Sequence, residues 1–115
     1  YLQAAGGGLI VNLGCAGVQN LVAWQKITPY AIAKHGIIIY TKSLAKELAP
    51  QKITVNVVSP GVVENSVNVA KFSHQLPTRR AATLQELTNA VWFFVNPEAD
   101  YLTGQILEVA GGCNL

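Results

Sequence analysis

Three short apolar runs alternate with two helical patterns, and this alternation limits the possible folds more than any other feature of the chain. The runs cover residues 9–13, 53–58 and 105–109, and glycine or proline stands close to each of them. The first run is almost continuously apolar, which is typical of a strand buried on both faces. Strands that alternate with helices favour a parallel α/β sheet with right-handed crossovers. We therefore expect one α/β unit, without repeats or a second domain.

The first helical pattern is bounded by two prolines. Thr28 suits the N-cap, and Pro29 suits the first helical position, where an N–H is not needed. Pro50 predicts that the helix ends near residue 49. Residues 37–40 are apolar in nearly every direction around the axis, which a helix with a single buried face does not need. Either the helix is deeply buried in its own domain, or it packs on its sheet and on a partner subunit. We favour the second alternative, which predicts a homodimer or homotetramer formed through helix 28–49.

The second helical pattern starts with a capping box at Thr83 and Glu86. An apolar stripe follows, and Pro97 ends the helix; the stripe consists of Leu87, Ala90, Val91 and Phe94. The polar stretch before it, up to about residue 82, is predicted to contain one short helix around residues 66–73.

The composition limits the kinds of partner that we expect for this chain. Of the 115 residues, 50% are hydrophobic and 12% are charged, about half the usual charged fraction. This balance favours a piece of a larger domain or a chain that buries surface in an oligomer. The net charge is +2 with scattered basic residues, so no nucleic-acid partner is expected. No apolar stretch reaches the roughly 18 residues that span a bilayer, so no membrane partner is expected either.

The two cysteines indicate the cellular compartment, and the first residue indicates where the natural N-terminus lies. Cys15 and Cys113 do not resemble a disulfide framework, so we expect a cytoplasmic protein. The chain starts at Tyr1 without a methionine, so we expect its true N-terminus to lie further upstream. No metal site is expected.

Tyr30 and Lys34 are the main candidates for chemistry. Their spacing of four residues places both side chains on the same helix face. A nearby cation favours the phenolate, so we expect the pKa of Tyr30 to lie below its ordinary value of about 10. A phenol with such a pKa can donate or accept a proton near neutral pH.

Taken in order, these motifs resemble the C-terminal half of a short-chain dehydrogenase/reductase. The resemblance covers nearly the whole chain and is carried by residues 9–12, the Tyr30-x-x-x-Lys34 pair, residues 41–50, residues 53–61 and residues 101–112. It is closest to the 3-oxoacyl-acyl-carrier-protein reductase-like group, with pteridine reductase-like members as neighbours. It implies that residues 1–115 form one partial domain, the C-terminal half of a doubly wound parallel Rossmann-type sheet. The glycine-rich half of that domain would precede Tyr1.

The resemblance also implies an NAD(P)(H)-dependent oxidoreductase acting on a small carbonyl or alcohol substrate. The cofactor is NADP or NAD, with NADP slightly favoured, and the residues that choose between them would precede Tyr1. Tyr30 would transfer a proton to or from the substrate oxygen while the nicotinamide transfers hydride. Lys34 would lower the pKa of Tyr30 and hydrogen-bond the nicotinamide ribose.

Other family positions map onto the segment after the second strand. Pro60 and Gly61 would turn the chain beneath the nicotinamide, and the backbone of Val63 would meet the carboxamide. Asn65 would stand near the pyrophosphate. Residues 64–78 would form the substrate lid, whose end Arg79 and Arg80 would anchor. An ordinary turn after a strand is the alternative interpretation of Pro60-Gly61.

Cys15 departs from the family pattern, because it stands where the family has its catalytic serine. A thiol is a weak donor, and the loss of one such donor can lower a rate roughly 10²- to 10³-fold. Cys15 either contacts the substrate in place of the serine or is a small buried hydrophobic residue. Two alternative functions stay open: a pteridine-type reductase, and a catalytically weak member that acts as a binding or structural subunit.

Overall fold

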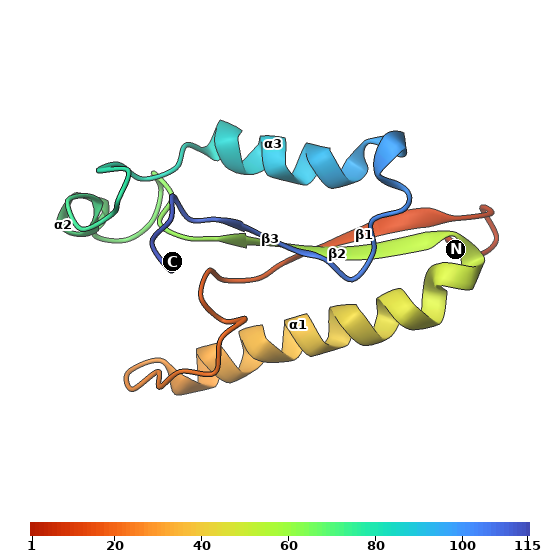
Figure 1. Ribbon diagram of the computed structural model, residues 1–115, viewed down its shortest axis with the longest axis horizontal. Helices are drawn as coiled ribbons and strands as arrows, with labels where there is room; N and C mark the ends of the chain where they lie inside the picture. Colours follow the sequence, from red (N-terminus) through yellow and green to blue (C-terminus); the bar gives the residue numbers. More distant parts are fainter.

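A three-stranded parallel sheet lies between two helices in the computed structural model, which describes residues 1–115 (Figure 1). The strands are β1 (Gly8–Leu13), β2 (Ile53–Pro60) and β3 (Ile106–Val109), in the order β1-β2-β3. Both strand pairs are parallel, with Gly8 opposite Ile53 and Val57 opposite Ile106. The predicted α/β class and the partial Rossmann-type sheet are confirmed.

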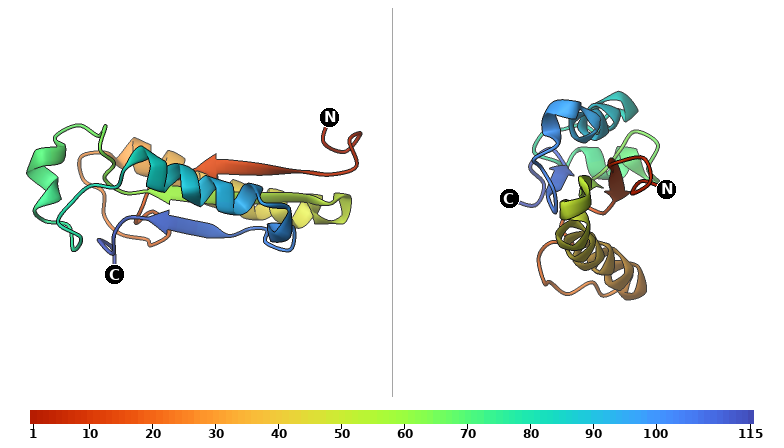
Figure 2. Two further views of the ribbon diagram at one scale, coloured as in Figure 1. Left: turned by 90° about the horizontal axis from the view of Figure 1, so that it is seen from above. Right: turned by 90° about the vertical axis from the view of Figure 1, so that its right-hand side faces the viewer.

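The two long helices cover opposite faces of the sheet. Helix α1 (Thr28–Leu48) lies on one face and α3 (Leu84–Val95) on the other, and both views of Figure 2 show this arrangement. The short helix α2 (Val69–Ser73) lies beyond the ends of the strands. Two 3₁₀ turns, η1 (Ala49–Gln51) and η2 (Pro97–Ala99), follow α1 and α3. The sheet therefore has a layer on each side, as its sequence predicts.

The core is centred on β2, which has a strand on each side and a helix on each face. Val55, Val57 and Val58 of β2 are completely buried. Two apolar clusters form between β2 and α1, one around Ile38 and Val57 and the other around Ala45 and Val55. Because β-branched side chains pack well on a pleated surface, these valines make β2 the buried centre of the molecule.

Strand β1 is less buried than its apolar sequence predicts. Its alternate side chains project to opposite faces; Ile10 packs into the α1 cluster, whereas Leu9 and Leu13 are 38% and 52% exposed. The prediction of burial on both faces is wrong for this strand within residues 1–115. The reason is its place at the edge of the sheet, where β2 is its only partner.

The helix ends agree with the prolines and with one of the two predicted caps. Thr28 is the first helical residue and Ile27 is the N-cap, so the predicted Thr28 cap is wrong by one position. The Thr28 hydroxyl instead donates to the carbonyl of Trp24. The α3 capping box is confirmed: Thr83 Oγ1 accepts the N–H of Glu86, and the Glu86 carboxylate accepts the N–H of Thr83.

Candidate functional site

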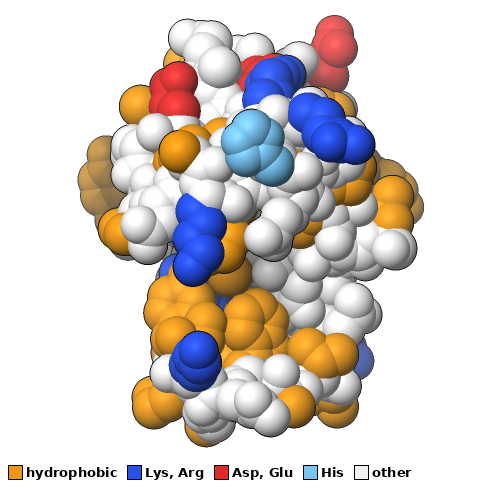
Figure 3. All heavy atoms as spheres, turned by 90° about the vertical axis from the view of Figure 1, so that its left-hand side faces the viewer, with side chains coloured by type: hydrophobic (Ala, Val, Ile, Leu, Met, Phe, Trp, Pro, Cys, Tyr) orange, Lys and Arg blue, Asp and Glu red, His pale blue; other side chains and the backbone are white.

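The candidate residues gather at the carboxyl ends of the strands. All three strands end at the same edge, where α1 begins and α2 lies, on the left of Figure 1. Figure 3 looks at this end: apolar side chains dominate the part below, where α1 begins, and charged side chains gather above. In open α/β sheets, ligands bind outside the carboxyl ends of the strands. This edge is therefore the place to build the site.

Tyr30 and Lys34 lie side by side on the first turns of α1. The Lys34 Nζ atom is 5.7 Å from the centre of the Tyr30 ring, and it donates a hydrogen bond to the carbonyl of Leu13 at 3.0 Å. That carbonyl is at the last position of β1, so the bond fixes the amine at the strand edge. Tyr30 is 47% exposed, which leaves its phenol accessible to a ligand.

The pKa of Tyr30 is raised, whereas the sequence predicted a lowered value. Burial is the largest cause, and the hydrogen bond and charge of the neighbouring Cys15 thiol raise the pKa of Tyr30 further. Lys34 does not reverse this direction, because its ammonium group is held at the Leu13 carbonyl and the phenol is half-exposed to water, which screens the interaction. In this state the phenol is protonated at neutral pH, so it can donate a proton.

Cys15 lies beside the end of β2. The N–H groups on either side of it bind that strand: Gly14 donates to the Val58 carbonyl and Ala16 to the Pro60 carbonyl, both at 2.9 Å. A side chain at Gly14 would collide with the Ser59 hydroxyl, so the position before Cys15 needs glycine. The structure thus brings Cys15, Tyr30 and Pro60 to one edge.

Pro60 and Gly61 form the end of β2 as the sequence predicts. The Gly61 N–H donates to the Val109 carbonyl at 3.0 Å, which ties this turn to β3. A Cβ atom on Gly61 would lie 3.0 Å from the Cα atom of Ala110, so the close approach of the Gly61 and Ala110 backbones favours glycine here. The turn therefore has a packing reason, in addition to the cofactor role that the resemblance implies.

Val63 and Asn65 lie beyond this turn, and no hydrogen bond links either residue to Tyr30. The Val63 N–H donates to Ser66 Oγ at 3.0 Å, and the Val63 carbonyl accepts the Ser66 N–H at 2.7 Å. Both backbone groups assigned to the carboxamide are therefore already bonded within the chain. Asn65 is exposed. The roles of these two residues stay predictions.

The residues at this edge fit the nicotinamide end of a dinucleotide by their chemistry. Lys34 is an ammonium group with three N–H donors, one of which binds Leu13. Tyr30 offers an exposed hydroxyl next to it, and the turn at Gly61 brings the backbone to the same edge. A ribose hydroxyl and a reacting oxygen are the groups that such donors bind.

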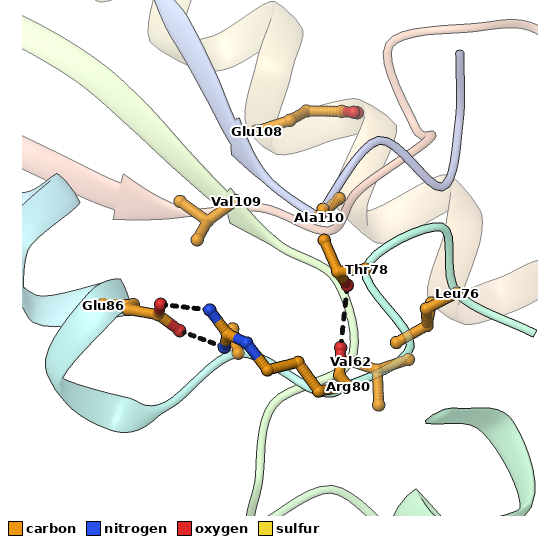
Figure 4. A pocket seen from close by; sticks show the side chains of 10 residues that line it. Val62, Leu76, Thr78, Arg80, Glu86, Glu108, Val109 and Ala110 are labelled. Atoms are coloured by element: carbon orange, nitrogen blue, oxygen red, sulfur yellow. Dashed lines mark hydrogen bonds and ion pairs between the residues drawn. The ribbon is translucent and has the colours of Figure 1, made fainter. Parts of the chain in front are cut away.

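A cavity of about 260 Å³ lies on the α3 side of the same edge, between the 76–82 segment and the end of β3. Arg80 crosses it and binds the Glu86 carboxylate through both terminal nitrogens, at 2.8 and 2.6 Å (Figure 4). The Thr78 hydroxyl donates to the Arg80 carbonyl. The Arg80 side chain thus ties this segment to α3, whereas Arg79 makes no side-chain hydrogen bond or ion pair; the role of both as anchors of a substrate lid stays a prediction.

Sequence reasoning missed three residues at this edge. Ser59 lies behind Gly14, Leu13 supplies the carbonyl that holds Lys34, and Glu108 binds the backbone of Gly17. Only Glu108 gave a signal in the sequence, as the single acid in an otherwise apolar closing strand.

The structure combines a parallel Rossmann-type sheet with a tyrosine and a lysine one helical turn apart at its carboxyl edge. This combination defines a class of protein, and comparison with known sequences identifies the family. The family profile described as "Enoyl-(Acyl carrier protein) reductase" matches residues 2–114. The chain belongs to the short-chain dehydrogenase/reductase family.

Among individual relatives, the chain is similar to proteins named 3-oxoacyl-[acyl-carrier-protein] reductase FabG. It is 39% identical over 113 residues to the one from Escherichia coli (strain K12), which covers 92% of this chain and 43% of the relative. It is 38% identical over 112 residues to that of Vibrio harveyi, covering 91% of this chain and 45% of the relative. The chain thus spans less than half the length of these relatives. None of its helices has the length and apolar character needed to cross a membrane.

Proposed function

We propose that this chain is the C-terminal part of an oxidoreductase that moves a hydride between NAD(P)(H) and a carbonyl or alcohol carbon. The observation that carries the proposal is the placement of Tyr30, Lys34 and Cys15 at the carboxyl edge of a parallel sheet. The names of the relatives make a 3-oxoacyl thioester the first substrate class to test, ahead of a pteridine.

In the proposed reaction, the nicotinamide supplies the hydride and the chain supplies the proton. Tyr30 is protonated, because burial and Cys15 raise its pKa, so it donates the proton to the substrate oxygen as carbonyl reduction proceeds. Lys34 orients the ribose with the N–H donors that Leu13 leaves free. Cys15 faces the same oxygen as a weak donor.

The complete active site needs groups that residues 1–115 do not contain. No glycine-rich loop of the kind that binds a pyrophosphate at a helix N-terminus follows β1. We place that loop, and the residues that choose between NADP and NAD, in a segment that pairs with the exposed edge of β1. Both cofactors should be assayed, NADP first.

Replacement of Tyr30 by phenylalanine tests the proposal in the complete protein. We expect Tyr30→Phe to lower kcat for reduction of a 3-oxoacyl thioester about 10²- to 10⁴-fold, because the proton donor is lost. The rate is followed by the absorbance of the reduced nicotinamide. Tyr40→Phe is the matched control, since Tyr40 is exposed on the same helix and should leave kcat unchanged. Full activity in Tyr30→Phe would contradict the proposed proton transfer.

A catalytically weak member is the second candidate, and Cys15 is the observation that favours it. If the thiol limits the reaction, Cys15→Ser should raise kcat many-fold, because a hydroxyl is the stronger donor. A wild-type enzyme that is already active, and that Cys15→Ser does not improve, would remove this candidate.

A further inference from the structure

Glu108 makes a contact across the carboxyl edge that the proposed reaction does not use. Its Oε1 atom accepts the backbone N–H of Gly17 at 2.6 Å, although the two residues lie 91 positions apart. Figure 4 shows that Glu108 and Val109 extend to opposite sides of β3, with Val109 toward the Arg80–Glu86 pair. Glu108 therefore serves the segment that follows β1 and takes no part in the Arg80 pair.

Gly17 needs this partner. It is buried in the segment after β1, between buried Ala16 and Val18, and its φ angle is +88°. A buried N–H without a hydrogen bond is costly, and a carboxylate is among the strongest acceptors for it. The Glu108 carboxylate thus fixes the chain at Gly17, two residues after Cys15.

The hydrogen bonds at this edge form a closed circuit: they link the segment that contains Cys15 to β2, β2 to β3, and β3 back to that segment. The segment after β1 binds β2 through Gly14 and Ala16, and the end of β2 binds β3 through Gly61. Glu108 of β3 returns to the first segment at Gly17. Two of these three links are backbone bonds, so Glu108 is the one side chain that completes the circuit.

We propose that Glu108 is a positioning residue that holds the Cys15 segment in place, and so sets where the Cys15 thiol lies relative to the Tyr30 hydroxyl. The consequence for the reaction rests on the proposed function, whereas the positioning itself does not. A displacement of about 1 Å at a reacting group can lower a rate about 10²-fold. Loss of the link should therefore reduce kcat more than it changes KM.

Three substitutions in the complete protein separate the hydrogen bond from the charge. Glu108→Gln keeps an oxygen at the same reach, Glu108→Asp keeps the charge but withdraws the oxygen, and Glu108→Ala removes both. We expect Glu108→Gln to stay within about twofold of wild type in kcat, and Glu108→Asp and Glu108→Ala to lose about tenfold or more. Glu98→Ala, at an exposed acid in η2, is the control.

The rate at which iodoacetamide alkylates Cys15, measured by mass spectrometry of its peptide, gives a readout that needs no activity. Glu108→Ala and Glu108→Asp should speed this alkylation several-fold, because the released segment exposes the thiol, and Glu108→Gln should not. If Glu108→Ala does not fold, the comparison of Glu108→Gln with Glu108→Asp remains. Equal alkylation rates in wild type, Glu108→Asp and Glu108→Ala would overturn the proposal, and so would a Glu108→Gln variant as impaired as Glu108→Asp. A protein without reductase activity that still shows the alkylation pattern would refute the proposed function and support the positioning.

Discussion

The Cys15 thiol changes the proton chemistry of Tyr30. A thiolate at this position carries a negative charge that a serine hydroxyl does not carry, and this charge opposes ionisation of the phenol. Burial acts in the same direction and is the larger cause. The fold therefore favours the neutral phenol, and the stability that this preference contributes is present below about pH 10 and lost as the pH rises through the pKa of folded Tyr30.

This balance predicts the ionisation of Tyr30 in the cofactor-free protein. The difference in ultraviolet absorbance between wild type and Tyr30→Phe, followed against pH, should give a midpoint above the ordinary value of 10.0. Cys15→Ala should lower that midpoint toward 10.0 without reaching it, because burial remains. A wild-type midpoint below 10.0 would show that Lys34 controls the phenol after all.

Among the elements, local signals predicted what local contacts determine. The Thr83–Glu86 capping box, the proline stop after α1 and the alternation of strands and helices along the chain all depend on residues close in sequence, and all three are confirmed. The burial of β1, in contrast, depends on which strands flank it, and the sequence of a short apolar run gives no information about its neighbours in the sheet. The predicted direction of the Tyr30 pKa shift is wrong for the same reason, because the burial of the phenol and its contact with Cys15 both arise only through the fold.

The start of α3 predicts a second titration. The pKa of Glu86 is lowered from 4.5 to about 2, first by the hydrogen bond from Arg80 and then by the backbone N–H of Thr83. The contribution of Glu86 to stability is therefore present above about pH 4.5 and lost as the pH falls through about 2. Carboxyl carbon shifts measured by NMR should show a midpoint near 2 that rises in Arg80→Ala but stays below 4.5.

Lys71→Ala is the control for this titration, because Lys71 is a cation on α2 that makes no ion pair with Glu86. A midpoint that Arg80→Ala leaves at about 2 would assign the shift to the capping box alone. High salt should raise the midpoint in wild type, since both side chains are largely exposed and water screens the pair.

At the scale of the whole molecule, the outer face of α1 has no cover within residues 1–115. Ile32 and Ile39 are 66% and 68% exposed, and they border an apolar groove of about 690 Å³ that also includes Trp24. Gly36 lies between them, and a Cβ atom there would touch nothing. Glycine inside a helix costs about 1 kcal/mol relative to alanine, so its place on this face favours a second helix that approaches closely.

We therefore predict that the complete protein is a dimer or tetramer that uses this face of α1. Ile39→Glu should shift the mass measured by sedimentation toward smaller species, because a buried unpaired carboxylate opposes association. Lys46→Glu is the control, since it changes charge on the same helix at an exposed polar position. Trp92→Glu tests the outer face of α3, where Trp92 is also exposed. An assembly that survives Ile39→Glu but dissociates to monomers in Trp92→Glu would move the interface to α3 and refute the assignment to α1.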